Sequence, residues 1–438
     1  MSEVKKDGIE GFLGAFAERA RPGEPGWLGG LRESAMEQFA SSGIPRTQEE
    51  EWKYTSLRNL EKASYQLAGS EGTDKAPDDV NGMAAIMEGL HGLVFVNGVY
   101  QEDLSSPPDP ETGVTVLDMA QAIESRPEEL QGLLGSNAAS GFQVFSSLNS
   151  ALFSHGAYVH VAADARLEKP LHLLFLATGA QSPFMVHPRN LFNIQEGGEL
   201  VVLEDYSGQC EGDYFCNPVT EVFSSKSSSV RLYKVIREGP AATHVSNLGV
   251  YQEEESSFTA NTYCLGGKLV RNDVVASLDG ERIECTLNGL AVGNGDQHID
   301  NHTRIIHSKP NCNSWEVYKS VLADNSHGVF NGKIFVAQDA QKTDAKQTNQ
   351  SLLLSDSAVM DSKPELEIYA DDVKCSHGSA SGNMDENSLH YLMTRGLSKE
   401  VAAKLLVKGF LSDIVEFIKN PTIKQFIENK LEEQINGY

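Results

Sequence analysis

From about Tyr158 onward the sequence is a succession of short β-rich runs, and no convincing helical pattern interrupts them for about 200 residues. Gly, Asn, Asp and Ser clusters separate the runs, which we expect to be strands: Leu171–Leu176, Leu200–Leu203, Val230–Val235, Phe258–Tyr263, Leu269–Ala276, Arg282–Leu287, Thr303–His307, Trp315–Val321, Lys333–Val336 and Leu366–Tyr369. Because helices do not alternate with these strands, a doubly wound α/β sheet is excluded. A sandwich, a barrel or a β-solenoid remains.

Two features favour the β-solenoid. Strand starts recur irregularly, at intervals of about 10 to 20 residues, without a strict period. The segment 337–356 is rich in Gln, Asn, Asp and Ser. Polar side chains stacked in successive coils can form hydrogen-bonded ladders, which a closed sandwich core tolerates poorly.

Helical patterns surround this β-rich region. At the N-terminal side, one apolar face predicts a helix that ends at Gly43-Ile44-Pro45, and its residues are Leu28, Leu31, Ala35 and Phe39. A polar patch, Thr47–Tyr54, and an exposed linker, Ser70–Asp79, follow. Leu93–Tyr100 predicts a short strand with an Asn-Gly turn. Further helices are expected from an Asp118 cap toward Leu134 and over Phe142–Phe153.

After Gly382 helical spacing returns. Leu389, Leu392 and Met393 predict a helix that ends at Gly396, and Ser398 is placed to cap the next one. The apolar face expected for that second helix is Leu406, Phe410, Ile414 and Phe417, before Asn420-Pro421 breaks it and an amphipathic stretch runs over Ile423–Ile435. These faces can pack against the chain's own body or against a partner.

These patterns divide the chain into a mostly helical N-terminal region (1–155), a β-rich core (156–380) and a C-terminal helical region (381–438). The ends of a solenoid are open sheet edges that need covering. We therefore expect the terminal helices to act as caps.

Composition excludes several functions. The formal charge is 36 Lys+Arg minus 61 Asp+Glu, or −25, with a pI near 4.9, which argues against binding to nucleic acid or to an anionic membrane surface. The longest apolar run, Leu171–Ala177, is far shorter than the roughly 20 residues of a membrane-spanning helix. No signal or transit peptide pattern begins the sequence, and six dispersed cysteines without a C-x-x-C pair indicate reduced thiols. A cytoplasmic location is expected.

Enzyme motifs are not found. Gly328-Val-Phe-Asn-Gly332-Lys333 has too few residues between its glycines for a phosphate loop, and Ile334 replaces the required Ser or Thr. G-x-S-x-G, H-E-x-x-H and G-x-G-x-x-G do not occur. His298 and His302 would lie about 13 Å apart on a strand, too far to share an ion, so a solvated or ladder role is expected.

The more informative cluster is Asp371-Asp372-Val373-Lys374-Cys375-Ser376-His377-Gly378. On an extended backbone Cys375 and His377 project to one face, roughly 6.5 Å apart. They could converge on a soft metal ion or on a transferred sulfur atom. One Cys and one His are half of a tetrahedral iron or iron–sulfur shell, so a second chain must complete such a site. The alternative is an ordinary Cys and His at a strand end.

The remaining cysteines are expected to behave as small buried hydrophobic residues, with a role in sulfur relay as the alternative: Cys210, Cys216, Cys264, Cys285 and Cys312.

Several ordered motifs carry a resemblance to a known family: Asn311–Lys319, Gly328–Ile334, Ala340–Asp344 with Gln347, Asn349 and Leu352–Ser355, Leu366–Gly378, and Tyr391–Gly396. Together they resemble the SufB/SufD family of iron–sulfur cluster assembly proteins, densely over 300–400 and more loosely over 156–300. The N-terminal Trp27-Leu28…Leu31-Arg32 and Pro45-Arg-Thr…Glu51-Trp-Lys-Tyr-Thr55 resemble the SufD branch.

This resemblance implies a right-handed parallel β-helix between helical ends, in agreement with the solenoid. It also implies a cytosolic complex with a SufB-like subunit and the SufC-like ATPase, which docks on the C-terminal helices. Cys375 and His377 match the family's interface Cys-x-His, where nascent clusters form.

The function expected is thus a non-enzymatic scaffold subunit without a tightly bound cofactor of its own. His377, with Cys375, would contact iron or a nascent cluster transiently, together with the SufB-like subunit. A homodimer is possible in isolation. The alternatives are a purely architectural subunit that activates the ATPase and binds no metal, and a β-helix carbohydrate-active enzyme with groove residues such as Asp273, Asp300 and Arg304.

Overall fold

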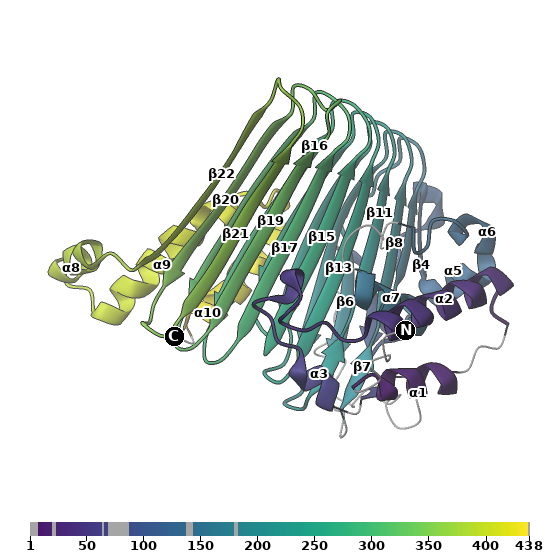
Figure 1. Cartoon of the computed structure of the whole chain (residues 1–438), viewed down its shortest axis with the longest axis horizontal. Coiled ribbons are helices and arrows are strands. Elements are labelled where there is room, and N and C mark those ends of the chain that lie inside the picture. The colour runs from purple at the N-terminus through teal and green to yellow at the C-terminus, as the bar shows by residue number, and fades with distance from the viewer. Residues whose placement is uncertain are drawn as a thin grey trace.

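The computed structural model describes residues 8–19, 23–63, 65–68, 87–136, 143–178 and 183–436. Its dominant feature is a β-solenoid of about seven turns, flanked by helices from both ends of the chain (Figure 1). The expectation of a mainly β protein with a solenoid core and helical terminal regions is confirmed. Among the described residues, no helix has both the length and the apolar character needed to span a membrane.

Two sheets form the walls of the solenoid. Sheet A contains β1 (Gln66–Leu67), β4 (Val114–Asp118), β5 (Ala157–Val161), β7 (Phe184–Val186), β8 (Arg189–Ile194), β10 (Tyr214–Cys216), β11 (Val219–Ser224), β13 (Thr243–Gln252), β15 (Leu269–Leu278), β17 (His298–His307), β19 (His327–Val336) and β21 (Val359–Ile368). Sheet B contains β2 (His91–Val96), β3 (Val99–Tyr100), β6 (Leu171–Ala177), β9 (Glu199–Gly208), β12 (Ser229–Arg237), β14 (Ser257–Cys264), β16 (Glu284–Gly293), β18 (Asn313–Leu322), β20 (Asp344–Leu353) and β22 (Lys374–Asn383).

From β12 to β22 the chain alternates between the two sheets, so each coil contributes one strand to each wall. Leu269 pairs with His298, 29 residues later, and His298 pairs with His327, again 29 residues later. The turn that leads into sheet B repeats the same left-handed backbone, with φ between 57° and 62°, at Ser227, Glu255, Arg282, Asn311 and Lys342. Because five residue types occupy this recurrent position, the coil is regular in backbone but not in sequence.

The solenoid interior combines apolar side chains with polar ladders. Leu232, Ala260 and Leu287 occupy one row of register positions on β12, β14 and β16 and are all buried. Beside such rows, the Asn288 amide donates to Asn261 Oδ1 at 3.0 Å and the Asn272 amide donates to Asn301 Oδ1 at 3.1 Å. The ladders expected from the polar composition are present, and they extend well before 337–356.

The N-terminal helices pack mainly against sheet A. They are α1 (Glu10–Glu18), α2 (Gly26–Ser42), η1 (Glu50–Trp52), α3 (Arg58–Lys62), η2 (Glu102–Leu104), η3 (Pro110–Thr112), α5 (Met119–Ser125), α6 (Pro127–Leu130) and α7 (Gln143–Leu152). As expected, Gly43 ends α2 with φ 68°, and the Asp118 carboxylate caps α5 in a capping box. The helix expected toward Leu134 is split into α5 and α6, since Pro127 starts a new helix.

The Asn-Gly turn expected in Leu93–Tyr100 connects the antiparallel strands β2 and β3, with φ of 47° and 76° at Asn97 and Gly98. The proposed linker Ser70–Asp79, like Phe142, lies outside the described residues.

The C-terminal helices are α8 (Glu386–Thr394), α9 (Lys399–Glu416), which the Ser398 side chain caps as expected, and α10 (Pro421–Asn436). The face predicted for α9 is confirmed at Ile414 and, partly buried against the same apolar cluster, at Phe410, but not as a whole, because the buried residues are Ala402, Val407, Leu411, Ile414 and Val415. This helix is apolar on most sides, so the pattern alone did not fix the packed face. The amphipathic stretch predicted over Ile423–Ile435 is confirmed, since α10 buries Ile423, Ile427, Leu431 and Ile435.

The expected capping of the solenoid is wrong at its C-terminal end. Helices α9 and α10 pack in one apolar cluster with Tyr233, Tyr263 and Leu290 of sheet B. Strands β21 and β22 of the last coil stay partly or largely exposed, and α8 projects away from the solenoid at the left of Figure 1. The last coil is therefore an open sheet edge.

Candidate functional site

Cys375 and His377 lie on β22, which is the terminal strand of sheet B and pairs only with β20 among the described strands. Because they are two residues apart on a strand, their side chains leave the same face. Ser379, two residues further on, donates a hydrogen bond to Ser362 Oγ of β21 at 2.8 Å. This face of β22 is thus turned toward sheet A. Both predicted site residues therefore lie at the open end of the solenoid, on the side of β22 that faces its interior.

The two side chains differ in exposure. His377 is exposed, whereas Cys375 is partly buried and packs beside Ile334, Val336 and Ala345. Burial, with a smaller contribution from the nearby Asp344 carboxylate, raises the pKa of the Cys375 thiol. The acidic neighbour that opposes the thiolate is thus Asp344 of the adjacent strand β20.

His377 continues a polar row across three strands. Glu316 of β18 is paired with Gln347 of β20, which is paired with His377 of β22. The Gln347 amide donates to Glu316 Oε2 at 2.7 Å, and its buried Oε1 has no hydrogen-bond partner among the described residues. Burial raises the pKa of Glu316 to about 7. The row therefore places a hydrogen-bond acceptor, Gln347 Oε1, and a titratable carboxyl, that of Glu316, in the interior below the exposed His377 imidazole.

The acidic residues of sheet A that the carbohydrate-active enzyme hypothesis would place in an open groove are covered by neighbouring side chains. Asp300 accepts hydrogen bonds from Thr55 Oγ1 at 2.5 Å and from Arg271 Nη1 at 2.8 Å, and Arg271 Nε donates to Asp273 Oδ1 at 2.9 Å. Asp273 and Asp300 are buried. An open acidic groove is not formed by these two carboxylates, and Arg304 lies nearby in a small polar pocket with Glu51 and His302.

Of the two histidines separated by four residues, His302 is not solvated, whereas His298 is partly exposed. His302 is buried and its Nε2 lies 2.9 Å from Asp300 Oδ1. His298 stacks edge to face on His327, its register partner, with ring centroids 4.7 Å apart, so its ladder role is confirmed. Burial lowers the pKa of His298 to about 4.

All six cysteines are free thiols. Cys216, Cys264, Cys285 and Cys312 are buried as expected, whereas Cys210 is partly exposed. Gly328–Lys333 lies inside the continuous strand β19, which excludes the phosphate loop.

Sequence reasoning missed one cluster, in which Cys216, Glu238 and His244 converge in the interior. These residues are far apart in the sequence, and only the parallel register of β10 with β13 brings Cys216 opposite His244.

Two family descriptions together match most of the chain. "SufBD protein N-terminal region" matches residues 23–173, and "SUF system FeS cluster assembly, SufBD core domain" matches residues 175–410. The second alone spans more than half of the sequence. This chain belongs to the SufBD family of iron–sulfur cluster assembly proteins, as the motifs around Cys375 and His377 predicted.

Similar proteins indicate the branch of the family that this chain resembles. The chain is 30% identical over 426 residues to the iron–sulfur cluster assembly SufBD family protein slr0076 of Synechocystis, covering 95% of this chain and 93% of that one. It is 28% identical over 406 residues to the iron–sulfur cluster assembly protein SufD of Escherichia coli, covering 92% of each chain. The chloroplastic protein ABCI7 of Arabidopsis thaliana is 30% identical over 417 residues, covering 91% of this chain and 84% of that protein. The SufD-like character expected from the N-terminal motifs is confirmed.

Proposed function

We propose that this chain is a non-catalytic scaffold subunit that pairs with a SufB-like subunit through its open last coil. The supporting observation is the exposure of β22, whose outer backbone edge has no neighbouring strand among the described residues. An unpaired strand edge can be extended by a strand of another chain. Gly378 and Gly382 have no side chain and Ala380 has only a methyl group, so the backbone of a partner strand can approach β22 closely.

His377, with Cys375, is proposed to contact iron or a nascent cluster at this interface. An imidazole and a thiol supply two ligands of a four-ligand shell, and the SufB-like subunit supplies the others. The metal is cargo here, held between two chains while the cluster is built. The polar row Glu316–Gln347–His377 supports this assignment, because an acceptor beneath the imidazole can orient the ring.

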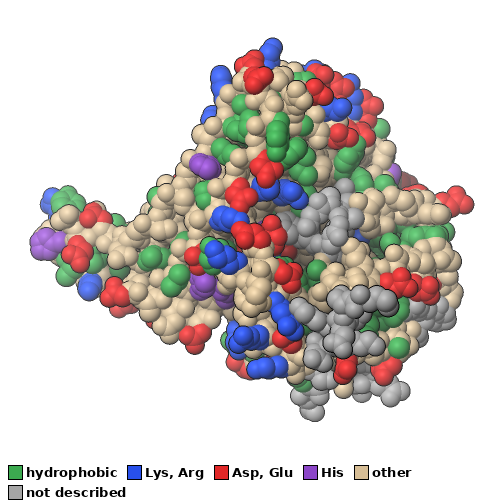
Figure 2. Space-filling model, in the orientation of Figure 1, with side chains coloured by type: hydrophobic (Ala, Val, Ile, Leu, Met, Phe, Trp, Pro, Cys, Tyr) green, Lys and Arg blue, Asp and Glu red, His purple; other side chains and the backbone are tan. Residues whose placement is uncertain are grey.

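A SufC-like ATPase is proposed to dock on the C-terminal helical region (381–438). Tyr391, Met393, Val401 and Leu405 are large apolar side chains that are 41–57% exposed, and all lie on α8 and α9. Figure 2 shows hydrophobic side chains at the surface of the lobe that projects from the solenoid. Because the sequence holds no nucleotide-binding loop, the energy of ATP must arrive through such a partner. The complex is proposed to be cytoplasmic.

The test is the yield of clusters on the complex reconstituted with SufB-like and SufC-like subunits. Cys375→Ala and His377→Ala should lower the iron and sulfide bound per complex. Ser381→Ala is the matched control, because Ser381 is exposed on the same strand and has the same facing as His377. Full cluster yield in both variants, with the complex intact, would remove Cys375 and His377 from the site.

A second candidate is a purely architectural subunit that activates the ATPase and touches no metal. The partial burial of Cys375 and the raised pKa of its thiol favour this alternative. It predicts that the two variants leave both ATPase stimulation and the cluster spectrum unchanged. In isolation, the same open edge is available to a second copy of this chain, and the mass of the isolated protein in solution tests for that homodimer.

A further inference from the structure

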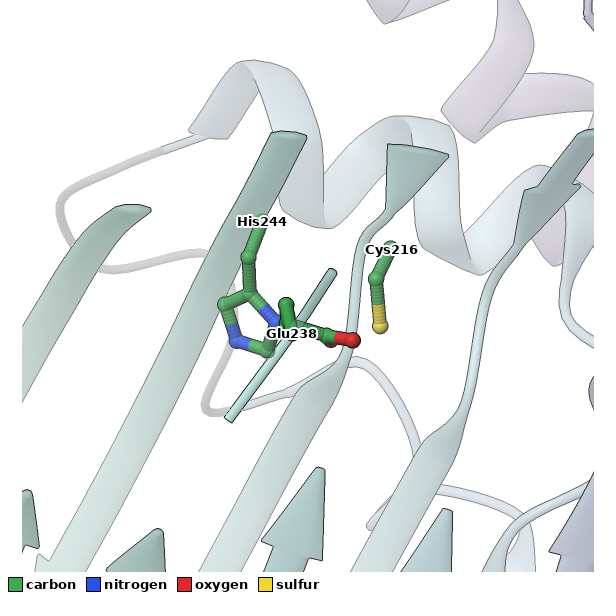
Figure 3. A group of neighbouring side chains, drawn as sticks. All are labelled: Cys216, Glu238 and His244. Atoms are coloured by element: carbon green, nitrogen blue, oxygen red, sulfur yellow. The ribbon is translucent and has the colours of Figure 1, made fainter. Parts of the chain in front are cut away.

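A buried thiol, carboxylate and imidazole meet inside the first half of the solenoid. Cys216 ends β10, and His244 is its register partner on β13, so both side chains leave sheet A next to each other. Glu238 directly follows β12 of sheet B and reaches the same point from the opposite wall. Figure 3 shows the Glu238 carboxylate between the His244 ring and the Cys216 sulfur.

The ligand-forming atoms of these three side chains all lie within 4.8 Å of one another. The side chains are buried, with exposed fractions of 3% for Cys216, 6% for Glu238 and 0% for His244. A thiolate, an imidazole and a carboxylate are the ligand types that Zn²⁺ and Fe²⁺ accept in proteins. A small side-chain adjustment brings three atoms at this spacing around a single ion.

A second shell already holds the carboxylate in place. The Tyr214 hydroxyl donates to Glu238 Oε2 at 2.5 Å and itself accepts from the Gly239 amide at 2.9 Å. This arrangement requires glycine at position 208, where a Cβ would lie 2.0 Å from the Tyr214 oxygen. His244 Nδ1 lies 2.9 Å from Glu238 Oε1, whereas its buried Nε2 has no partner among the described residues. Hydrogen bonds therefore use only one nitrogen of this ring.

The formal charges around the cluster also favour a cation. Lys234 Nζ lies 3.4 Å from Glu204 Oε2 and formally neutralises it, which leaves the Glu238 carboxylate as an additional buried negative charge. A divalent ion that displaces the thiol proton of Cys216 to solvent adds one net positive charge. That charge balances Glu238, and buried charges persist when they are balanced in this way.

We propose that Cys216, Glu238 and His244 form a resident binding site for a divalent ion of the Zn²⁺/Fe²⁺ class. The site is distinct from the Cys375–His377 edge, because it lies in earlier coils and its three ligands come from one chain. Three protein ligands leave a fourth position for water or an exchanging ligand. Cys216 and Glu238 also line a small pocket with Gly98, Phe175 and Val186, next to the turn between β2 and β3. The ion would tie sheet A to the chain that follows β12.

The test is an anaerobic titration of the reduced, metal-free full-length protein with Co²⁺, which reports thiolate ligation through a near-ultraviolet charge-transfer band. Wild type should bind one Co²⁺ with this band, and Zn²⁺ should displace it. Cys216→Ser should lose the band, whereas Cys264→Ser, which changes another buried thiol, should keep it. Tyr214→Phe removes the second-shell hydrogen bond and should weaken binding by about tenfold or more.

Two results would overturn the site, and the second has a special case that shows where the metal binds instead. Wild type that binds no stoichiometric Co²⁺ excludes it directly, without any variant having to fold. A band that persists in Cys216→Ser also excludes it. A band that is lost in Cys375→Ser and retained in Cys216→Ser assigns the metal to the edge strand instead. That last outcome separates the failure of this proposal from the failure of the cluster-interface proposal.

Discussion

Glu316→Gln should change how the stability of the solenoid depends on pH. Glu316 is buried on β18, and burial raises its pKa from an ordinary 4.5 to about 7. Above pH 4.5 the unfolded chain loses this proton while the folded chain keeps it. The folded state is therefore penalised progressively as the pH rises from 4.5 to about 7, and the penalty is constant above that range.

The magnitude follows from the size of the pKa shift. Each pKa unit corresponds to about 1.4 kcal/mol, so the wild type should lose roughly 2–3 kcal/mol between pH 5 and pH 8 through this group alone. Glutamine does not titrate, and its carbonyl oxygen can still accept from the Gln347 amide. The variant should therefore gain roughly 2–3 kcal/mol relative to wild type over the same range.

Urea unfolding of both proteins at pH 5, 6, 7 and 8 measures this difference. The two proteins are compared by how much their free energy of unfolding changes with pH, and not by its value at one pH. The new side-chain amide needs a hydrogen-bond acceptor at every pH, so any cost of that amide is the same at all four pH values. Glu284→Gln, which replaces an exposed carboxyl on β16, is the control and should track wild type. Parallel curves for wild type and Glu316→Gln would refute the assignment of Glu316 as a buried acid that titrates near neutrality.

Three further predictions address packing and partners. Thr55→Val removes a buried hydrogen bond to the Asp300 carboxylate and should cost roughly 1.5–3 kcal/mol in urea unfolding, whereas the exposed control Ser56→Ala should cost almost nothing. Gly289→Ala places a Cβ 2.2 Å from the Tyr318 ring and should cost roughly 1–3 kcal/mol, whereas Gly378→Ala, with no atom within 4 Å, should be neutral; equal costs would contradict the packing described. Leu405→Asp on the exposed face of α9 should abolish capture of the SufC-like ATPase while the circular dichroism spectrum is preserved, and retained capture would move the docking site elsewhere.

Local signals in the sequence predicted the helix ends well. Gly43, Asp118 and Ser398 act at helix termini as expected, because capping depends on a few neighbouring residues, whereas Pro421, expected to break α9, begins α10. The packed face of α9 was not predictable, since apolar residues occupy most of its sides and contact with sheet B decides which of them are buried.

Each of the ten predicted strands overlaps an observed strand, but their lengths were underestimated, and the ten-residue strands β13, β20 and β22 were not predicted. Strand β19 runs over His327–Val336, whereas only its last four residues have a clear β pattern. Polar residues such as Asn331 are buried in such strands because neighbouring coils cover them. The Cys375–His377 pair could be predicted because its two residues are only two positions apart in the sequence. The Cys216 cluster could not, because the parallel register alone assembles it.

Hydrogen exchange at β22, with and without the SufB-like subunit, tests most directly whether the open edge strand is the assembly surface. In the free chain the amides of β22 that point away from β20 should exchange rapidly. On binding they should become protected, more strongly than those on the opposite edge strand of sheet B, β3. Unchanged exchange at β22 in a complex that has formed would contradict the account.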